Sequence, residues 1–190
     1  ALRRAAAAGA LETPSSFARW AQAPETQAYL LDRAALLPPL DAVLLIGADG
    51  ALLGSPRPSG PMTDGMAGRN GIAVLEGADV SRTLGVPVPS SQEGRWLLPL
   101  AKRAGGSDGD LLGAVVGVVN LGHFEGLHAG LALRPGMSVM FFREDGLLLS
   151  ASGAAAQAVA TDLGETPLFR VPGSRAGRGT VNAPGLDGEL

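Results

Sequence analysis

Hydrophobic residues recur at helical spacing through the first 37 residues of the chain. Apolar side chains three and four residues apart would form one face of a helix: Tyr29, Leu30, Ala34 and Leu37. Pro14 interrupts the pattern, and Pro24, followed by an acidic residue, is typical of the first turn of a new helix. We therefore predict helical structure over residues 1–37, with breaks at these prolines and an end at the proline pair 38–39.

The pattern then changes to short apolar runs separated by turn residues. The run at residues 42–46 is followed by Asp49 and Gly50 and then by two leucines. An Asp-Gly pair between apolar runs favours a tight β-hairpin, because such turns need positive φ angles at their central positions. Residues 54–71 are rich in Pro, Gly and Ser and are predicted to form a loop.

Two further strands are predicted in the middle of the chain. Residues 94–100 have strand character, and Pro99 within them predicts an edge strand or a bulge, since proline cannot donate a backbone hydrogen bond. A glycine-rich turn at 105–109 leads to the long apolar run 111–121, which we predict to be a buried strand. Residues 123–131 are predicted to form a short amphipathic helix.

The Asp-Gly hairpin pattern occurs twice, at an offset of 96 residues. Residues 41–55 and 137–151 share five positions: Val43 and Val139, Asp49 and Asp145, Gly50 and Gly146, Leu52 and Leu148, Leu53 and Leu149. Each copy follows a predicted helix and a proline, which favours two related units over a chance pair of hairpins. We place the boundary near residues 133–136, giving an N-terminal helix plus first unit at 1–132 and a second, incomplete unit at 133–190.

Composition narrows the classes of function. The 190 residues are 46% hydrophobic and 17% charged, with 28 Gly and 14 Pro, which fits a turn-rich globular protein. The net charge of −3 provides no basic field for nucleic acid or an acidic membrane surface. The absence of cysteine excludes disulfides, thiolate metal sites and a cysteine nucleophile. The longest apolar run, 111–119, is about half of the roughly 20 residues that a membrane-spanning helix needs.

Motifs for catalysis and for metal binding are lacking. His123 and His128 would be separated by about 140° around a helix, so they do not share a ligand-bearing face. The sequence contains no Gly-x-Ser-x-Gly elbow, no phosphate-binding Gly-Lys-Ser/Thr loop and no catalytic pair of carboxylates at a known spacing. We therefore predict no catalytic residue, no metal, no cofactor and no enzymatic activity.

The order of these elements resembles the Cache (PDC, PAS-like) sensor family in its double-Cache arrangement. The resemblance rests on four segments that occur in the family's order, at residues 44–53, 94–103, 108–121 and 136–149. It implies an α+β fold of two tandem PAS-like units, each an antiparallel sheet flanked by helices, with a long N-terminal helix running along both. The second unit would be truncated or incomplete within this sequence.

The resemblance also implies a cellular setting. Double-Cache domains lie on the periplasmic side of the bacterial inner membrane, between membrane helices of a receptor. Their cytoplasmic output is a histidine kinase of a two-component system, a diguanylate cyclase, a phosphodiesterase or a chemoreceptor signalling module. We expect membrane helices and such an output domain outside the present sequence.

Four residues are the predicted ligand-binding set. Trp96 would supply an aromatic wall, and Arg82, placed in the loop before the Gly-Arg-Trp strand, would neutralise a ligand carboxylate. Asn120 ends the long buried strand, where the resemblance places an acidic ligand partner. Arg95 is a further cationic candidate, as is Lys102; Arg95 is adjacent to Trp96, and on a strand the two would point to opposite faces.

These observations lead to a sensor hypothesis and one alternative. In the first, the chain binds a small molecule, for which an organic anion is one candidate, and transmits a conformational change across the membrane. In the second, it is a ligand-free module that forms a homodimer or docks a periplasmic protein. The alternative is motivated by an apolar stripe in the N-terminal region: Phe17, Trp20, Tyr29 and Leu30.

Overall fold

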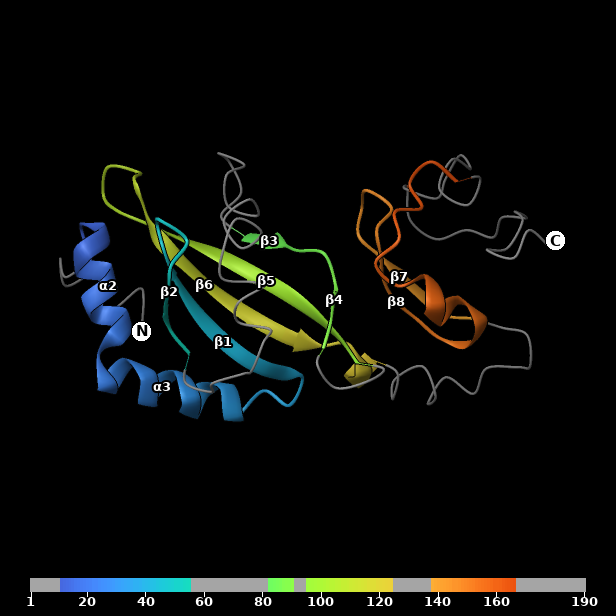
Figure 1. Cartoon of the computed structure of the whole chain (residues 1–190), viewed down its shortest axis with the longest axis horizontal. Helices are drawn as coiled ribbons and strands as arrows, with labels where there is room; N and C mark the ends of the chain where they lie inside the picture. The colour runs from blue at the N-terminus through green and yellow to red at the C-terminus, as the bar shows by residue number, and fades with distance from the viewer. Residues whose placement is uncertain (1–10, 56–81, 91–94, 125–137, 167–190) are drawn as a thin grey trace. The chain divides into compact units, whose positions relative to one another are not determined.

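The computed structural model describes residues 11–55, 82–90, 95–124 and 138–166 (Figure 1). The chain divides into two compact units. The first comprises Ala1–Gly85 with Pro89–Asn120, and the second Val86–Val88 with Leu121–Leu190. The predictions for residues 1–10, most of the 54–71 loop and most of the 123–131 helix lie outside the described residues.

Two helices begin the first unit, where the sequence predicted helix with breaks. They are α2 (Pro14–Gln22) and α3 (Pro24–Ala35), each with proline in its first turn. Thr13 caps α2: its hydroxyl accepts a hydrogen bond from the Ser16 amide at 3.2 Å, and the Ser16 hydroxyl accepts one from the Thr13 amide at 3.0 Å. A single long N-terminal helix along both units stays a prediction.

The first unit is built around one antiparallel sheet. Its strands are β1 (Leu40–Gly47), β2 (Leu52–Gly54), β3 (Arg82–Leu84), β4 (Val88–Pro89), β5 (Trp96–Gly105) and β6 (Leu111–Asn120). They follow the order β2-β1-β6-β5-β3, and the short strand β4 also pairs with β5. The hairpin and the long buried strand predicted from the sequence are confirmed.

The helices pack on the face of the sheet that carries Leu45. Gly54 is opposite Leu45 in the β1–β2 ladder, and a Cβ added to Gly54 would meet the side chain of Gln27 and the carbonyl of Ala21. At the end of the sheet, Phe17 fills the space next to Gly113. Both Phe17 and Leu45 are fully buried, so the core lies between the helices and this face.

The other face of the sheet is also apolar and buried. It carries side chains from the alternate positions of three strands: Ala42, Leu44, Ile46, Leu97, Ala101, Ala114, Val116 and Val118. Each of these residues is at most 3% exposed. The centre of the sheet is therefore buried on both faces.

Pro99 corrects the prediction of an edge strand. The strand β5 lies in the interior of the sheet, between β6 and β3. The Pro99 carbonyl accepts a hydrogen bond from Gly85, just beyond the end of β3. In an antiparallel strand the N and C=O of one residue point to the same side, so the missing N–H faces the place where the β3 ladder ends.

The two predicted Asp-Gly hairpins are confirmed and share their turn geometry. In the first, Gly47 and Ala51 are joined by a backbone hydrogen bond, and the Asp49 carboxylate accepts a hydrogen bond from the Ala51 amide. The second repeats both bonds 96 residues later, between Arg143 and Leu147 and from the Leu147 amide to Asp145.

The register and the turn glycines repeat as well. Pairs 45–54 and 46–52 of the first hairpin correspond to pairs 141–150 and 142–148 of the second, with an irregularity at the same step. Gly50 and Gly146 have φ angles of 83° and 99°, which a side chain would strain. The resemblance of the two segments thus extends from residue identity to backbone geometry.

The described part of the second unit contains a two-stranded sheet. Its strands are β7 (Met140–Phe142) and β8 (Leu148–Ala151), followed by a 3-10 helix, η1 (Gly153–Ala158). After η1 the chain returns along β8, where Leu148 exchanges backbone hydrogen bonds with Ala160 and Thr161. Leu148 is fully buried by this arrangement.

Candidate functional site

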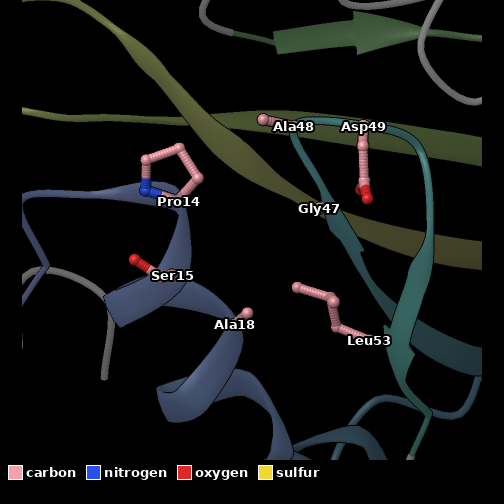
Figure 2. A pocket seen from close by; sticks show the side chains of 7 residues that line it. All are labelled: Pro14, Ser15, Ala18, Gly47, Ala48, Asp49 and Leu53. Atoms are coloured by element: carbon pink, nitrogen blue, oxygen red, sulfur yellow. The ribbon is translucent and has the colours of Figure 1, made fainter.

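A hollow of about 300 Å³ lies between the start of α2 and the β1–β2 hairpin (Figure 2). Figure 2 shows Leu53 extending between the helix and the hairpin, with Asp49 at the turn. The other lining residues are small or apolar, except for one serine: Pro14, Ser15, Ala18, Gly47 and Ala48. None of the sequence-predicted ligand residues lines this hollow.

The two polar side chains of the hollow already have local partners. The Ser15 hydroxyl lies 3.2 Å from that of Thr13, and the Asp49 carboxylate accepts the Ala51 amide at 3.0 Å. Specific ligand pockets need polar groups that converge on the ligand. We interpret the hollow as the junction between helix and hairpin, and it does not define a ligand site.

The register of β5 and β6 separates two of the predicted ligand residues. Asn120 is opposite Leu97, so its side chain belongs to the Leu97 face of the sheet. Trp96 alternates with Leu97 and shares the helix-bearing face with Leu98. Both Trp96 and Asn120 are half-buried. The two residues therefore do not converge on one ligand across a single face.

Arg95 precedes β5 at the end of the strand where the register places Asn120. It is exposed, it directly precedes β5, and its carbonyl accepts a hydrogen bond from Ser90 at 2.8 Å. Asn120, at the end of β6, donates its backbone N–H to Pro39 at 2.8 Å. Both residues thus belong to the same end of the β5–β6 pair.

The position of Arg82 differs from the one predicted from the sequence. The sequence placed it in a loop, but it is the first residue of β3, and the register sets it opposite Lys102 of β5. Lys102 is exposed, and it forms no ion pair with any residue of the described ranges. This pairing of two cationic residues depends on a strand that the sequence pattern did not reveal.

An ion pair joins two residues of the second hairpin. Arg143 contacts the Asp145 carboxylate through two nitrogens, with Nη2 at 2.6 Å. The hydrogen bond from Arg143 holds the pKa of Asp145 below its ordinary value, and the same bond raises the pKa of Arg143. Because both side chains are solvent-accessible, we interpret this ion pair as a stabilising contact of the hairpin and not as a catalytic centre.

Neither a metal centre nor a membrane span emerges from the described part of the chain. Within those ranges, no group of three or more His, Asp or Glu side chains is arranged to hold an ion. None of the helices described there has the length and apolarity that crossing a membrane requires.

Comparison with solved structures identifies the fold. The chain is similar to the extracellular domain of the histidine kinase rpHK1S-Z16, with a TM-score of 0.61 and 25% identity, over 77% of this chain and 60% of that one. It is also similar to the ligand-binding domain of the Pseudomonas aeruginosa amino acid chemoreceptor PctB in complex with L-Arg (TM-score 0.53, 23% identity, 79% and 62% coverage). No family model and no curated protein sequence matches the chain.

These similarities confirm the resemblance to Cache domains. The curled antiparallel sheet with flanking helices is the fold of the extracytoplasmic sensor domains of bacterial membrane receptors. The chain thus has the fold of Cache-type sensor domains, and the two structures that it resembles are an extracellular domain of a histidine kinase and a ligand-binding domain of a chemoreceptor. It spans 60% of the length of the histidine kinase domain.

Proposed function

We propose that this chain receives a small-molecule signal outside the inner membrane for a bacterial membrane receptor. The observation that carries the proposal is the similarity of the fold to a histidine kinase's extracellular domain, at a TM-score of 0.61 over 77% of the chain. Ligand binding would favour one of two arrangements of the sheet and its helices and so shift the equilibrium of an output domain. A ligand that binds both arrangements equally would transmit nothing.

The ligand site in this proposal lies at the end of β5 and β6 that holds Arg95 and Asn120. An arginine can pair with a carboxylate through two parallel hydrogen bonds, and an asparagine side chain both donates and accepts. These two groups suit a small organic anion that also carries a hydrogen-bonding group. Trp96 then has a packing role on the helix-bearing face of the sheet.

Two tandem units form the second part of the proposal. The repeated hairpin supports it, because the same turn bonds and the same register occur at an offset of 96 residues. Duplication of one structural unit would leave the same turn at equivalent positions of the two copies. The first unit would bind the ligand, and the second would connect it to the membrane.

Native mass spectrometry of the purified chain tests the proposed binding. The chain is mixed with pooled small carboxylates, amino acids, purines and polyamines, and a one-to-one adduct with one compound is expected. Asn120→Ala and Arg95→Gln should each reduce the adduct at least tenfold, whereas Arg19→Gln, on α2, should leave it unchanged. The absence of any adduct across the four classes would contradict the function, and an adduct that both variants retain would contradict only the site.

A further inference from the structure

The turn that joins β5 to β6 repeats the backbone bonds of the two Asp-Gly hairpins (Figure 1). The Gly106 N–H donates to the Asp110 carbonyl at 2.9 Å, and the Gly109 N–H donates to the Gly106 carbonyl at 3.2 Å. The φ angle of Gly109 is 84°, close to the angles of Gly50 and Gly146. An Asp-Gly pair thus occupies the same two positions of one turn three times within the described residues.

The three aspartates of these turns differ in what their carboxylates contact. Asp49 and Asp145 each accept the amide hydrogen bond two residues further on, at 3.0 and 3.3 Å, and Asp145 also pairs with Arg143. The Asp108 carboxylate forms no hydrogen bond or ion pair with any residue of the described ranges. Its side chain is therefore not held in one rotamer by a polar contact.

The glycines that follow these aspartates differ in their surroundings. Gly50 and Gly146 are buried, and a Cβ added to Gly146 would meet the backbone of Gly164. Gly109 is exposed, and a Cβ added there would meet nothing within 4 Å. The peptide bond between Asp108 and Gly109 is therefore open to water and has room to change its geometry.

We propose that Asp108 is a site of spontaneous isomerisation to isoaspartate. The backbone nitrogen of Gly109 attacks Cγ of Asp108: a nitrogen–carbon bond forms, the C–OH bond of the carboxyl group breaks, and water leaves with the amide proton. Water then opens the resulting succinimide ring. Opening at the main-chain carbonyl of residue 108 yields isoaspartate, and opening at the side-chain carbonyl restores aspartate. One water is released and one is consumed, so the mass of the chain does not change.

The contacts of the two hairpin turns oppose the same reaction there. Ring closure fixes the carboxyl carbon to the glycine nitrogen, and so it would break the bond from the Ala51 or Leu147 amide. Loss of water also needs a neutral carboxyl group, whereas the hydrogen bonds from Arg143 and Leu147 lower the pKa of Asp145. In both hairpins the glycine that would have to move is buried.

Isoaspartate would lengthen the main chain of this turn by one methylene group. The hydrogen bond from Arg103 to the Gly109 carbonyl, at 2.6 Å, depends on the present backbone path. The turn lies at the opposite end of the β5–β6 pair from Arg95 and Asn120. The proposal therefore goes beyond ligand sensing, because it concerns a covalent change away from the proposed ligand site.

Peptide mapping of the folded chain after prolonged incubation in mildly acidic buffer tests the proposal. Trypsin places the three Asp-Gly pairs in three different peptides, because arginines lie between them, and electron-transfer fragmentation distinguishes isoaspartate from aspartate. Isoaspartate should accumulate at residue 108 at least tenfold faster than at Asp49 or Asp145. Asp108→Glu should abolish this product, because glutamate cannot close the five-membered ring. Asp110→Glu, at the exposed aspartate followed by leucine, is the matched control and should leave it unchanged.

Incubation in urea separates the effect of structure from that of local sequence. In the unfolded chain the three pairs lose their fixed contacts, so their rates should become similar. Equal rates in the folded chain would overturn the proposal, as would a preference for residue 108 that persists in urea or an isoaspartate signal that Asp108→Glu retains. Circular dichroism checks that the chain and both variants are folded in the buffer. None of these results depends on the proposed sensor function.

Discussion

Asp145 and Asp49 occupy equivalent turn positions but have different surroundings. Each carboxylate accepts the amide hydrogen bond two residues further on, which stabilises the turn. Only Asp145 also pairs with an arginine, because Arg143 stands where the first hairpin has Gly47. The sequence repeat predicted both turns. It did not predict the ion pair between Arg143 and Asp145, which depends on a single side chain.

Replacing each aspartate by asparagine separates the turn from the ion pair. Asn retains the accepting oxygen, so Asp49→Asn should change the free energy of unfolding little, whereas Asp145→Asn should lower it by about 0.2–1 kcal/mol, the range for exposed pairs. The folded-state pKa of Asp145 is lowered, so its contribution is complete above about pH 4 and is lost as pH falls through that lowered pKa. Urea denaturation at pH 7 and pH 2.5 measures it, and a difference between the two variants that persisted at pH 2.5 would contradict the ion-pair explanation.

The helix α2 packs against the sheet because the large side chain of Phe17 fills the space left beside Gly113, which has no side chain. Phe17 is fully buried and packs in a cluster with Leu11, Ala104 and Leu112, while Gly113 leaves room for its ring. Trp20 contacts the same cluster and lies 5.6 Å from Phe17, ring centre to ring centre, but it is only partly buried. Phe17 therefore belongs to the core and not to an exposed dimerisation stripe.

Truncation of these two aromatic residues should have unequal effects. Phe17→Ala should lower the free energy of unfolding by about 3–5 kcal/mol, as for a fully buried phenylalanine, because the cavity it leaves cannot close. Trp20→Ala should lower the free energy of unfolding by clearly less, since part of the Trp20 ring already faces solvent. Equilibrium urea denaturation compares the two, and equal losses would show that α2 is not anchored through Phe17.

Local patterns predicted hairpins and helix starts well, and strand neighbours poorly. The Asp-Gly turns and the helix start at Pro24 depend on a few neighbouring residues, so the sequence shows them directly; Pro14, predicted as a break, is the first residue of α2. Pro99 was misread because its tolerance in β5 depends on where β3 ends, a pairing between distant segments. The strand β3 itself has three residues, too few for a recognisable pattern.

The candidate ligand residues illustrate the same limit. Arg95, Trp96 and Asn120 were chosen by residue type and position, and alternation along β5 already predicted that Arg95 and Trp96 face opposite sides. That Asn120 lies opposite Leu97, and so away from Trp96, follows only from the β5–β6 register. The cationic pair of Arg82 and Lys102 likewise needed the β3–β5 register to become visible.

The fold and the repeated hairpin together support the proposed extracytoplasmic sensor function. The sheet with α2 and α3 is the sensor fold, and the repeated hairpin supports a duplicated architecture. The proposed ligand site lies at the end of the sheet face opposite the helices.

The most direct test is a thermal-denaturation screen of the purified chain against small carboxylates, amino acids, purines and polyamines. A ligand at 100 times its dissociation constant adds about 2.7 kcal/mol to the free energy of unfolding. For a chain of this size, that corresponds to an increase in melting temperature of several degrees. We predict such a shift for at least one small organic anion, reduced in Arg95→Gln. An unchanged melting temperature with every compound would contradict the assignment of this chain as a ligand-binding sensor.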